Sequence, residues 1–163
     1  MSSQATGTSI QHSIVVEAPQ GRAFTVFTEQ FDRIKPHEHN LLGGEDVEET
    51  VFEARPGGRI YDRGVNGGMC VWARVLAVEP PERVVFTWDV SASWTLEADH
   101  EKTSEVEVRF VPEGPERTRV ELEHRHLERH GEGWEGMRDA VGSPQGWEPG
   151  LQRFAAYVAT APT

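Results

Sequence analysis

The alternation of apolar and polar residues predicts a sheet-rich chain with a helix near each end. Strict alternation is typical of half-buried strands, whereas apolar residues three or four apart indicate a helix. Strands are expected at residues 9–17, 45–54, 59–65, 70–78, 83–90, 104–111 and 117–127. An early helix is expected to begin at Ala18-Pro19 and to end at Pro36, because Ala23, Phe24, Phe27 and Phe31 follow at helical spacing.

The clearest strand pair is a central hairpin over residues 70–90. Its two arms are rich in Val, Phe and Trp, and they flank the sequence Glu79-Pro80-Pro81-Glu82. A Pro-Pro pair cannot continue a strand ladder, so a turn is predicted there. A second turn is predicted at Asn66-Gly67-Gly68, since Asn and Gly accept positive φ angles. Residues 35–44 are expected to form a loop, and residues 1–8 are small, polar and expected to be flexible.

The last third of the chain changes to a helical pattern. A short helix is predicted over Trp134, Met137 and Val141, with Gly142 as its C-cap. After Ser143-Pro144 a longer helix of ~14 residues, about 21 Å, is expected to begin near Gly146. Its broad apolar stripe consists of Trp147, Leu151, Phe154, Ala155 and Val158. Such a stripe suits a helix that crosses the concave face of a sheet.

Composition narrows the class of protein. A length of 163 residues is typical of one domain. No stretch approaches the ~18 apolar residues of a membrane helix, and the first residues lack the features of a signal peptide. Cys70 is the only cysteine, so no internal disulfide can form. These features predict a cytoplasmic protein, and a net charge of −11 argues against a nucleic-acid partner.

Five stretches, in their order along the chain, resemble the START-like (SRPBCC) superfamily. They are PGGRIYDRG, VLAVEPPERVVFTW, TSEVEVRF, TRVELEHRHLERHGEGWEGMRDAV, and SPQGW followed by LQRFAAYV. The chain is most similar to bacterial proteins that resemble the C-terminal domain of the activator of heat shock protein 90 ATPase. The resemblance covers roughly residues 10–160. It implies an α+β helix-grip (START/Bet v-like) fold over residues 9–163, in which a bent antiparallel sheet of about seven strands wraps round a long C-terminal helix.

The resemblance leaves several functions open, because members of the superfamily bind lipids and hormones, cyclise polyketides, hydroxylate rings or assist a chaperone. The first hypothesis is a cytoplasmic protein that binds a small apolar or amphipathic molecule between the sheet and the last helix. The second is a co-chaperone-like or stress-response module with a chaperone partner. The third is a cyclase, dehydratase or hydrolase that uses the same cavity. No cofactor is expected, and both a monomer and a homodimer remain open.

Ten residues are candidates for the lining of that cavity. Strand alternation and the terminal helix select Tyr61, Arg63, Trp72, Phe86, Trp88, Leu122, His124, Trp147, Leu151 and Phe154. Apolar walls with a few polar groups are typical of a small-molecule site, although the same side chains could simply pack as a solid core. Tyr61 and Arg63 could orient an anionic or carbonyl-bearing ligand. In the alternative, Arg59 and Arg63 pair with acids on the adjacent strand and point into water.

Histidine and cysteine offer further chemistry. His124 and His126 alternate onto one strand face, and two imidazoles at that spacing can chelate a metal. His37 and His39 repeat the spacing on a loop. A third ligand is not evident, so no metal site is predicted. His124 is instead expected to be a polar group of the cavity, with general acid–base chemistry as the alternative. A lone cysteine such as Cys70 is usually buried and inert, so no catalytic residue is predicted.

Overall fold

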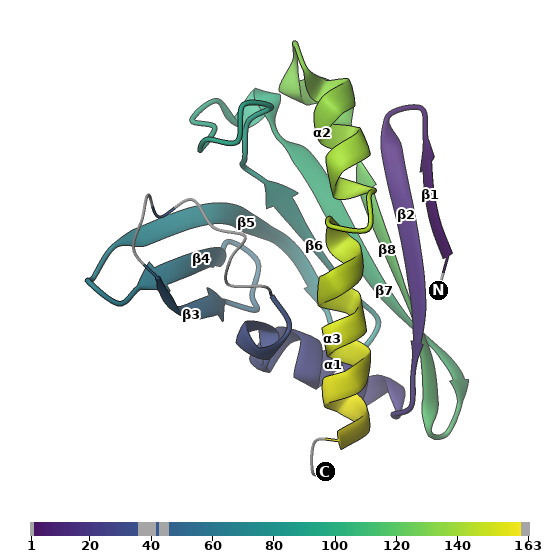
Figure 1. Cartoon of the computed structure of the whole chain (residues 1–163). Helices are drawn as coiled ribbons and strands as arrows, with labels where there is room; N and C mark the ends of the chain where they lie inside the picture. The colour runs from purple at the N-terminus through teal and green to yellow at the C-terminus, as the bar shows by residue number, and fades with distance from the viewer. Residues whose placement is uncertain (1, 36–41, 43–45, 161–163) are drawn as a thin grey trace.

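The fold is a curved antiparallel sheet with helices on its concave side (Figure 1). The computed structural model describes residues 2–35, 42 and 46–160. The strands are β1 (Ser2–Thr6), β2 (Ser9–Val16), β3 (Val47–Phe52), β4 (Arg59–Gly64), β5 (Met69–Glu79), β6 (Arg83–Trp88), β7 (Ser104–Gly114) and β8 (Arg117–Arg125). They lie in the order β1-β2-β8-β7-β6-β5-β4-β3, and each neighbouring pair is antiparallel. The chain therefore follows a meander, except that β8 closes back onto β2.

Three α-helices complete the fold, and an aromatic core lies between them and the sheet. They are α1 (Gln20–Glu29), α2 (Trp134–Val141) and α3 (Trp147–Thr160), and short 3₁₀ turns occur at η1 (Phe31–Arg33), η2 (His100–Lys102) and η3 (Leu127–His130). Phe27 of α1 joins the layers, because its ring centroid lies 5.6 Å from that of Phe110 on β7 and 5.5 Å from that of Phe154 on α3. Both partners are almost completely buried. The first helix and the last thus share one core.

The predicted helix-grip fold is confirmed. Each of the seven predicted strands is present, and α3 begins at Trp147 and runs for 14 residues. The N-terminus differs from the expectation, because Ser2–Thr6 forms β1 and pairs with β2. An edge strand of this kind is held by main-chain hydrogen bonds, so small polar residues carry no signal for it. The predicted loop at 35–44 lies mostly outside the described residues, as do His37 and His39.

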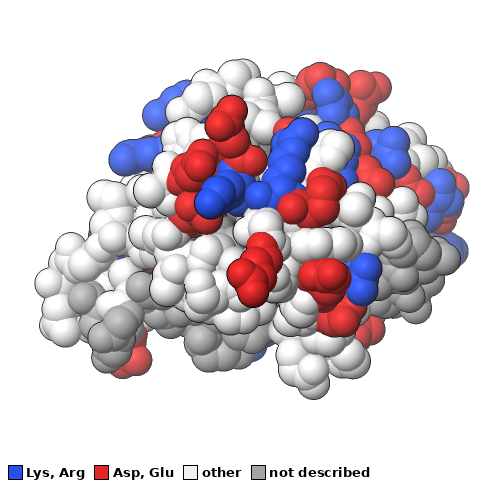
Figure 2. Space-filling view, turned by 90° about the horizontal axis from the view of Figure 1, so that it is seen from above, with Lys and Arg blue, Asp and Glu red and all other residues white. Residues whose placement is uncertain are grey.

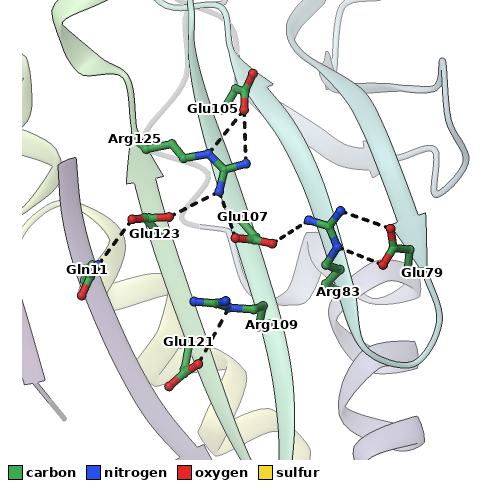
Figure 3. Close-up of polar contacts among 9 residues, drawn as sticks. All are labelled: Gln11, Glu79, Arg83, Glu105, Glu107, Arg109, Glu121, Glu123 and Arg125. Carbon is green, nitrogen blue, oxygen red and sulfur yellow. Dashed lines mark hydrogen bonds and ion pairs between the residues drawn. The ribbon is translucent and has the colours of Figure 1, made fainter. Parts of the chain in front are cut away.

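The convex face of the sheet carries a ladder of ion pairs (Figure 3). Glu107 on β7 accepts hydrogen bonds from Arg83 Nη1 at 2.6 Å and from Arg125 Nη1 at 2.9 Å. Burial raises the pKa of Glu107, but the two arginines outweigh burial and hold that pKa below its usual range. In Figure 2, where the molecule is seen from above, acidic and basic side chains likewise lie next to one another rather than in separate fields. The charged side chains of this ladder thus pair with one another across neighbouring strands.

Candidate functional site

A pocket of about 620 Å³ lies between the concave face of the sheet and the junction of α2 with α3. Its volume is within the ~300–1,000 Å³ range typical of small-molecule sites. Side chains from α1, η1, β4, β5, β6 and β8 form its floor and sides. Residues around the start of α3 form the opposite wall, and the aromatic residues of the lining are Phe27, Phe31, Trp72, Trp88, Trp94 and Trp147.

Four of the five tryptophans of the chain border this pocket. The ring centroid of Trp88 lies 5.7 Å from that of Trp72 and 5.4 Å from that of Trp147, and both contacts are edge-to-face. Such contacts are the favoured geometry of aromatic pairs. Trp94 is different, because 45% of it is exposed and its backbone has a φ of 62°. Trp94 therefore lies where the pocket opens to solvent.

One ion pair interrupts the aromatic wall. Lys35 Nζ lies 3.0 Å from Asp62 Oδ2, and Asp62 Oδ1 accepts a hydrogen bond from Thr50 Oγ1 at 2.7 Å. Lys35 Nζ also lies 5.7 Å from the ring centroid of Trp72, within the range of a cation–π contact. Among the described residues that line the pocket, Lys35 and Asp62 are the only two with charged side chains. The pocket thus combines apolar walls with one charged point.

A hydrogen-bonded chain of side chains runs behind Trp147. Its indole Nε1 donates to His124 Nδ1 at 3.1 Å. An indole is only a donor, so His124 must be neutral with its proton on Nε2. That proton is donated to Ser104 Oγ at 2.7 Å, and the Ser104 hydroxyl donates to His130 Nε2 at 2.7 Å. Burial, with a smaller contribution from His130, lowers the pKa of His124 to about 3.

Five of the ten predicted lining residues border the pocket, namely Trp72, Trp88, Leu122, Trp147 and Leu151. Phe86 and Phe154 have no exposed surface and belong to the core below it. His124 also has no exposed surface, and it reaches the pocket only through its hydrogen bond to Trp147. The expectation that these three side chains line the cavity is therefore corrected: each supports the lining from behind.

The prediction that Tyr61 and Arg63 face the cavity is wrong. Arg63 Nη2 donates to Glu49 Oε1 on β3 at 2.8 Å, and 44% of the Arg63 side chain is exposed. Tyr61 lies on the same face of β4, where the Arg59 guanidinium stacks 5.3 Å from its ring centroid. The alternative, in which these arginines pair with acids and point outward, describes the structure. An arginine without a partner would be costly to bury in an aromatic pocket.

The pocket is also bordered by Lys35, Asp62 and Trp94, and by residues at the α2–α3 junction such as Ser143 and Gln145, none of which is predicted from the sequence. A signal for Asp62 was present, because strand alternation places it on the same face of β4 as the apolar Ile60. Ile60 has no exposed surface, and Asp62 is 1% exposed. The position of Lys35 carried no local signal, because it follows η1 outside any regular element.

In the described part of the chain, the histidines and the cysteine form neither a metal site nor a nucleophile site. His126 has a φ of 63° and follows the end of β8, so the expected alternation of His124 and His126 on one face is not present. Within the part of the chain that the structure describes, no group of three His, Cys, Asp or Glu side chains could hold a metal. Burial and the nearby Asp62 raise the pKa of the Cys70 thiol to about 11, which disfavours the reactive thiolate. The described helices include none that is long and apolar enough to cross a membrane.

Known proteins share this architecture. The family model described as "Activator of Hsp90 ATPase homolog 1-like protein" matches residues 17–159. One similar solved structure is that of an anthrahydroquino-γ-pyrone synthase, Txn09, complexed with SUM. Its sequence identity to this chain is 36% and the TM-score is 0.64, and the match covers 92% of this chain and 96% of that chain. The self-sacrificing resistance protein CalC from Micromonospora echinospora is 27% identical with a TM-score of 0.64, over 93% and 94%. A protein from Nitrosomonas europaea, 14% identical with a TM-score of 0.67 over 95% and 96%, shares the fold. No curated protein sequence matches.

Proposed function

The chain belongs to the family of Activator of Hsp90 ATPase homolog 1-like proteins, and we propose that it is a cytoplasmic protein that binds a small apolar or amphipathic molecule. The binding site is the pocket between the sheet and the α2–α3 junction. One observation carries the proposal: four of five tryptophans surround a space of about 620 Å³. Aromatic side chains that only filled a core would leave no such space, because protein interiors are close-packed.

The chemistry of the walls supports a ligand with aromatic rings. Each buried aromatic side chain offers ~150–250 Å² of contact surface, and aromatic pairs gain ~0.5–1.5 kcal/mol beyond the burial of area. Trp72, Trp88 and Trp147 present such surfaces around one space. The similar synthase has been solved in a complex with SUM, which supports ligand binding as the use of the fold here.

The test is native mass spectrometry of the protein purified from its own host, followed by solvent extraction of any bound molecule. Gly150 lies on α3 and borders the pocket, so Gly150→Phe should fill the space. The same change removes a helix-destabilising glycine, which is worth up to ~1 kcal/mol. Gln152→Phe is the matched control, because Gln152 is exposed on the same helix.

The expected result is a copurifying molecule of defined mass that is lost in Gly150→Phe and kept in Gln152→Phe. A molecule that is retained equally by both variants would place the binding site elsewhere. If wild-type protein carries nothing, and extracts of its host cause no mass shift, the binding proposal fails. A pull-down that enriches heat shock protein 90, with a change in that chaperone's ATPase rate, would then favour the co-chaperone hypothesis.

A ring-closing enzyme is a second candidate, favoured by the 36% identity to a synthase and by the ion pair in the pocket wall. In this candidate function Lys35 polarises a carbonyl oxygen of the substrate, and the aromatic walls hold the chain of the substrate folded. Ring closure by condensation releases water. An extracted ligand that loses the mass of one water on incubation with wild-type protein, and not with Gly150→Phe, would support it.

A further inference from the structure

We infer that Lys35, held by Asp62, recognises an oxygen atom on the ligand, and that the ligand is a multi-ring aromatic molecule with a phenolic or quinone oxygen at one edge. This inference rests on the proposed function, because it names the chemistry of the molecule in the same pocket. Lys35 and Asp62 form the one ion pair that borders the pocket among the described residues, and this pair would recognise the polar part of the ligand.

Asp62 is the fixed member of the pair. It is 1% exposed, and both of its carboxylate oxygens are occupied, Oδ1 by Thr50 Oγ1 and Oδ2 by Lys35 Nζ. Thr50 is held in turn, because its main-chain N–H donates to Asp32 Oδ1 at 2.7 Å. With two donors already in place, the role of Asp62 is to position the ammonium group of Lys35.

Lys35 is the member that a ligand can reach. The Lys35 side chain is 12% exposed, compared with 1% for Asp62, and both residues border the pocket. An ammonium group has three N–H donors and no acceptor, so it selects a ligand oxygen that accepts. The ammonium also lies 5.7 Å from the centroid of the Trp72 ring. A ligand ring packed near Trp72 would therefore bring an edge oxygen close to Lys35.

Charge balance narrows the type of oxygen. Lys35 and Asp62 together are neutral, and the remaining lining is largely apolar. A phosphate or a multiply charged acid would bring uncompensated charge into that environment, which is costly. A ketone or phenol oxygen needs only a hydrogen bond, and a hydrogen bond from a charged donor is stronger than one from a neutral donor. The pair is thus suited to oxygenated aromatic rings rather than to strongly anionic ligands.

The test compares pyrene with 1-hydroxypyrene, two probes that differ by one oxygen atom. Binding is followed by quenching of tryptophan fluorescence. The variant is the double change Lys35→Met with Asp62→Asn, because removal of Lys35 alone would leave a buried carboxylate without its counter-ion. Lys102→Met is the matched control, since Lys102 is the only other lysine and is exposed. Urea unfolding checks that each variant folds.

We expect the ratio of 1-hydroxypyrene affinity to pyrene affinity to fall about tenfold in the double variant, with pyrene affinity kept. The ratio should not change in Lys102→Met. A second readout is the absorbance of bound 1-hydroxypyrene, whose phenol should ionise at a lower pH in wild-type protein than in the double variant. If both probes bind and the ratio is unchanged, the role of Lys35 is refuted while the proposed pocket stands. If neither probe binds wild-type protein, the aromatic-ligand pocket itself is refuted, and this inference with it.

Discussion

His124 should make the protein sensitive to mild acid. The imidazole has no exposed surface, and its pKa in the folded protein is lowered to about 3 by burial and by His130. In the unfolded chain a histidine has a pKa of ~6.5. Below that pH the unfolded state takes up a proton that folded His124 does not accept. The stability that His124 contributes is therefore complete above pH 6.5, and it is lost as the pH falls toward 3.

The size of the effect follows from proton linkage. Each pH unit between the two pKa values changes the free energy of unfolding by about 1.4 kcal/mol for one proton. At pH 5 the loss from His124 alone is about 2 kcal/mol. This is a large share of the ~5–15 kcal/mol by which folded proteins are usually stable. Below about pH 3 the two states are equally protonated at this site, and the loss stops.

The perturbation that isolates this effect is His124→Gln. Glutamine cannot titrate, yet it carries an acceptor for Trp147 Nε1 and a donor for Ser104 Oγ. Urea unfolding, monitored by tryptophan fluorescence, should be measured from pH 8 to pH 5. As the pH falls, the free energy of unfolding should decrease less steeply in the variant than in wild-type protein, and the difference in slope should correspond to about one bound proton. His12 and His130, whose pKa values are also lowered by burial, are present in both proteins. The exposed His100→Gln is the matched control, with the wild-type slope expected.

Two results would contradict this reasoning. Equal pH slopes in wild-type protein and His124→Gln would mean that His124 binds the same number of protons in the folded and unfolded states. An NMR titration in which folded His124 protonates near pH 6.5 would be more direct evidence. It would rule out the hydrogen bond from Trp147 Nε1, because an imidazolium has no acceptor for it.

Three further outcomes are expected. Trp94→Ala should weaken binding of an aromatic probe about fivefold, as measured by probe titration. Because Trp94 is 45% exposed, the same change should alter the free energy of unfolding, measured in urea, by less than about 0.5 kcal/mol. Cys70, buried and with its pKa raised to about 11, should react with a thiol reagent at pH 8 about two orders of magnitude more slowly than in the unfolded chain. Glu107→Gln should cost about 1–3 kcal/mol at pH 7, because the carboxylate bridges Arg83 and Arg125. That cost should shrink as the pH falls below about 4.5. Glu107 has a lowered pKa in the folded wild-type protein, and once it is protonated the wild-type protein also lacks the charged carboxylate.

The elements that the sequence predicts well are those encoded by local alternation. Trp88 and Leu122 were assigned to the pocket because every second side chain of a strand faces the same way, and both border the pocket. Leu151 was assigned from the apolar stripe of α3 in the same manner. These predictions need only the period of the element and the knowledge of which face is buried.

The error on β4 came from the same rule applied with the wrong face. Tyr61 and Arg63 were chosen for their chemistry, although the apolar Ile60 already marked the opposite face as the buried one. Asp62 shares that face and borders the pocket. An acid among apolar residues on a strand is expensive to bury without a partner, so its position was itself a sign that a base had to lie nearby. The sequence could indicate the need for that base but not that Lys35 supplies it.

The remaining part of the site depends on contacts between residues far apart in the chain. Trp147 and His124 are 23 residues apart, and the hydrogen bond between them exists only after α3 has packed across the sheet. That bond has a consequence for recognition. Because the N–H of Trp147 is already donated to His124, this tryptophan can contact a ligand only through its ring. The indole N–H groups of Trp72 and Trp88 are buried and have no hydrogen-bond partner among the described residues. Trp147 therefore offers a ligand ring contact alone, and Lys35, the one positively charged donor among the described lining residues, should contribute most to discrimination between an oxygenated and a plain aromatic ring.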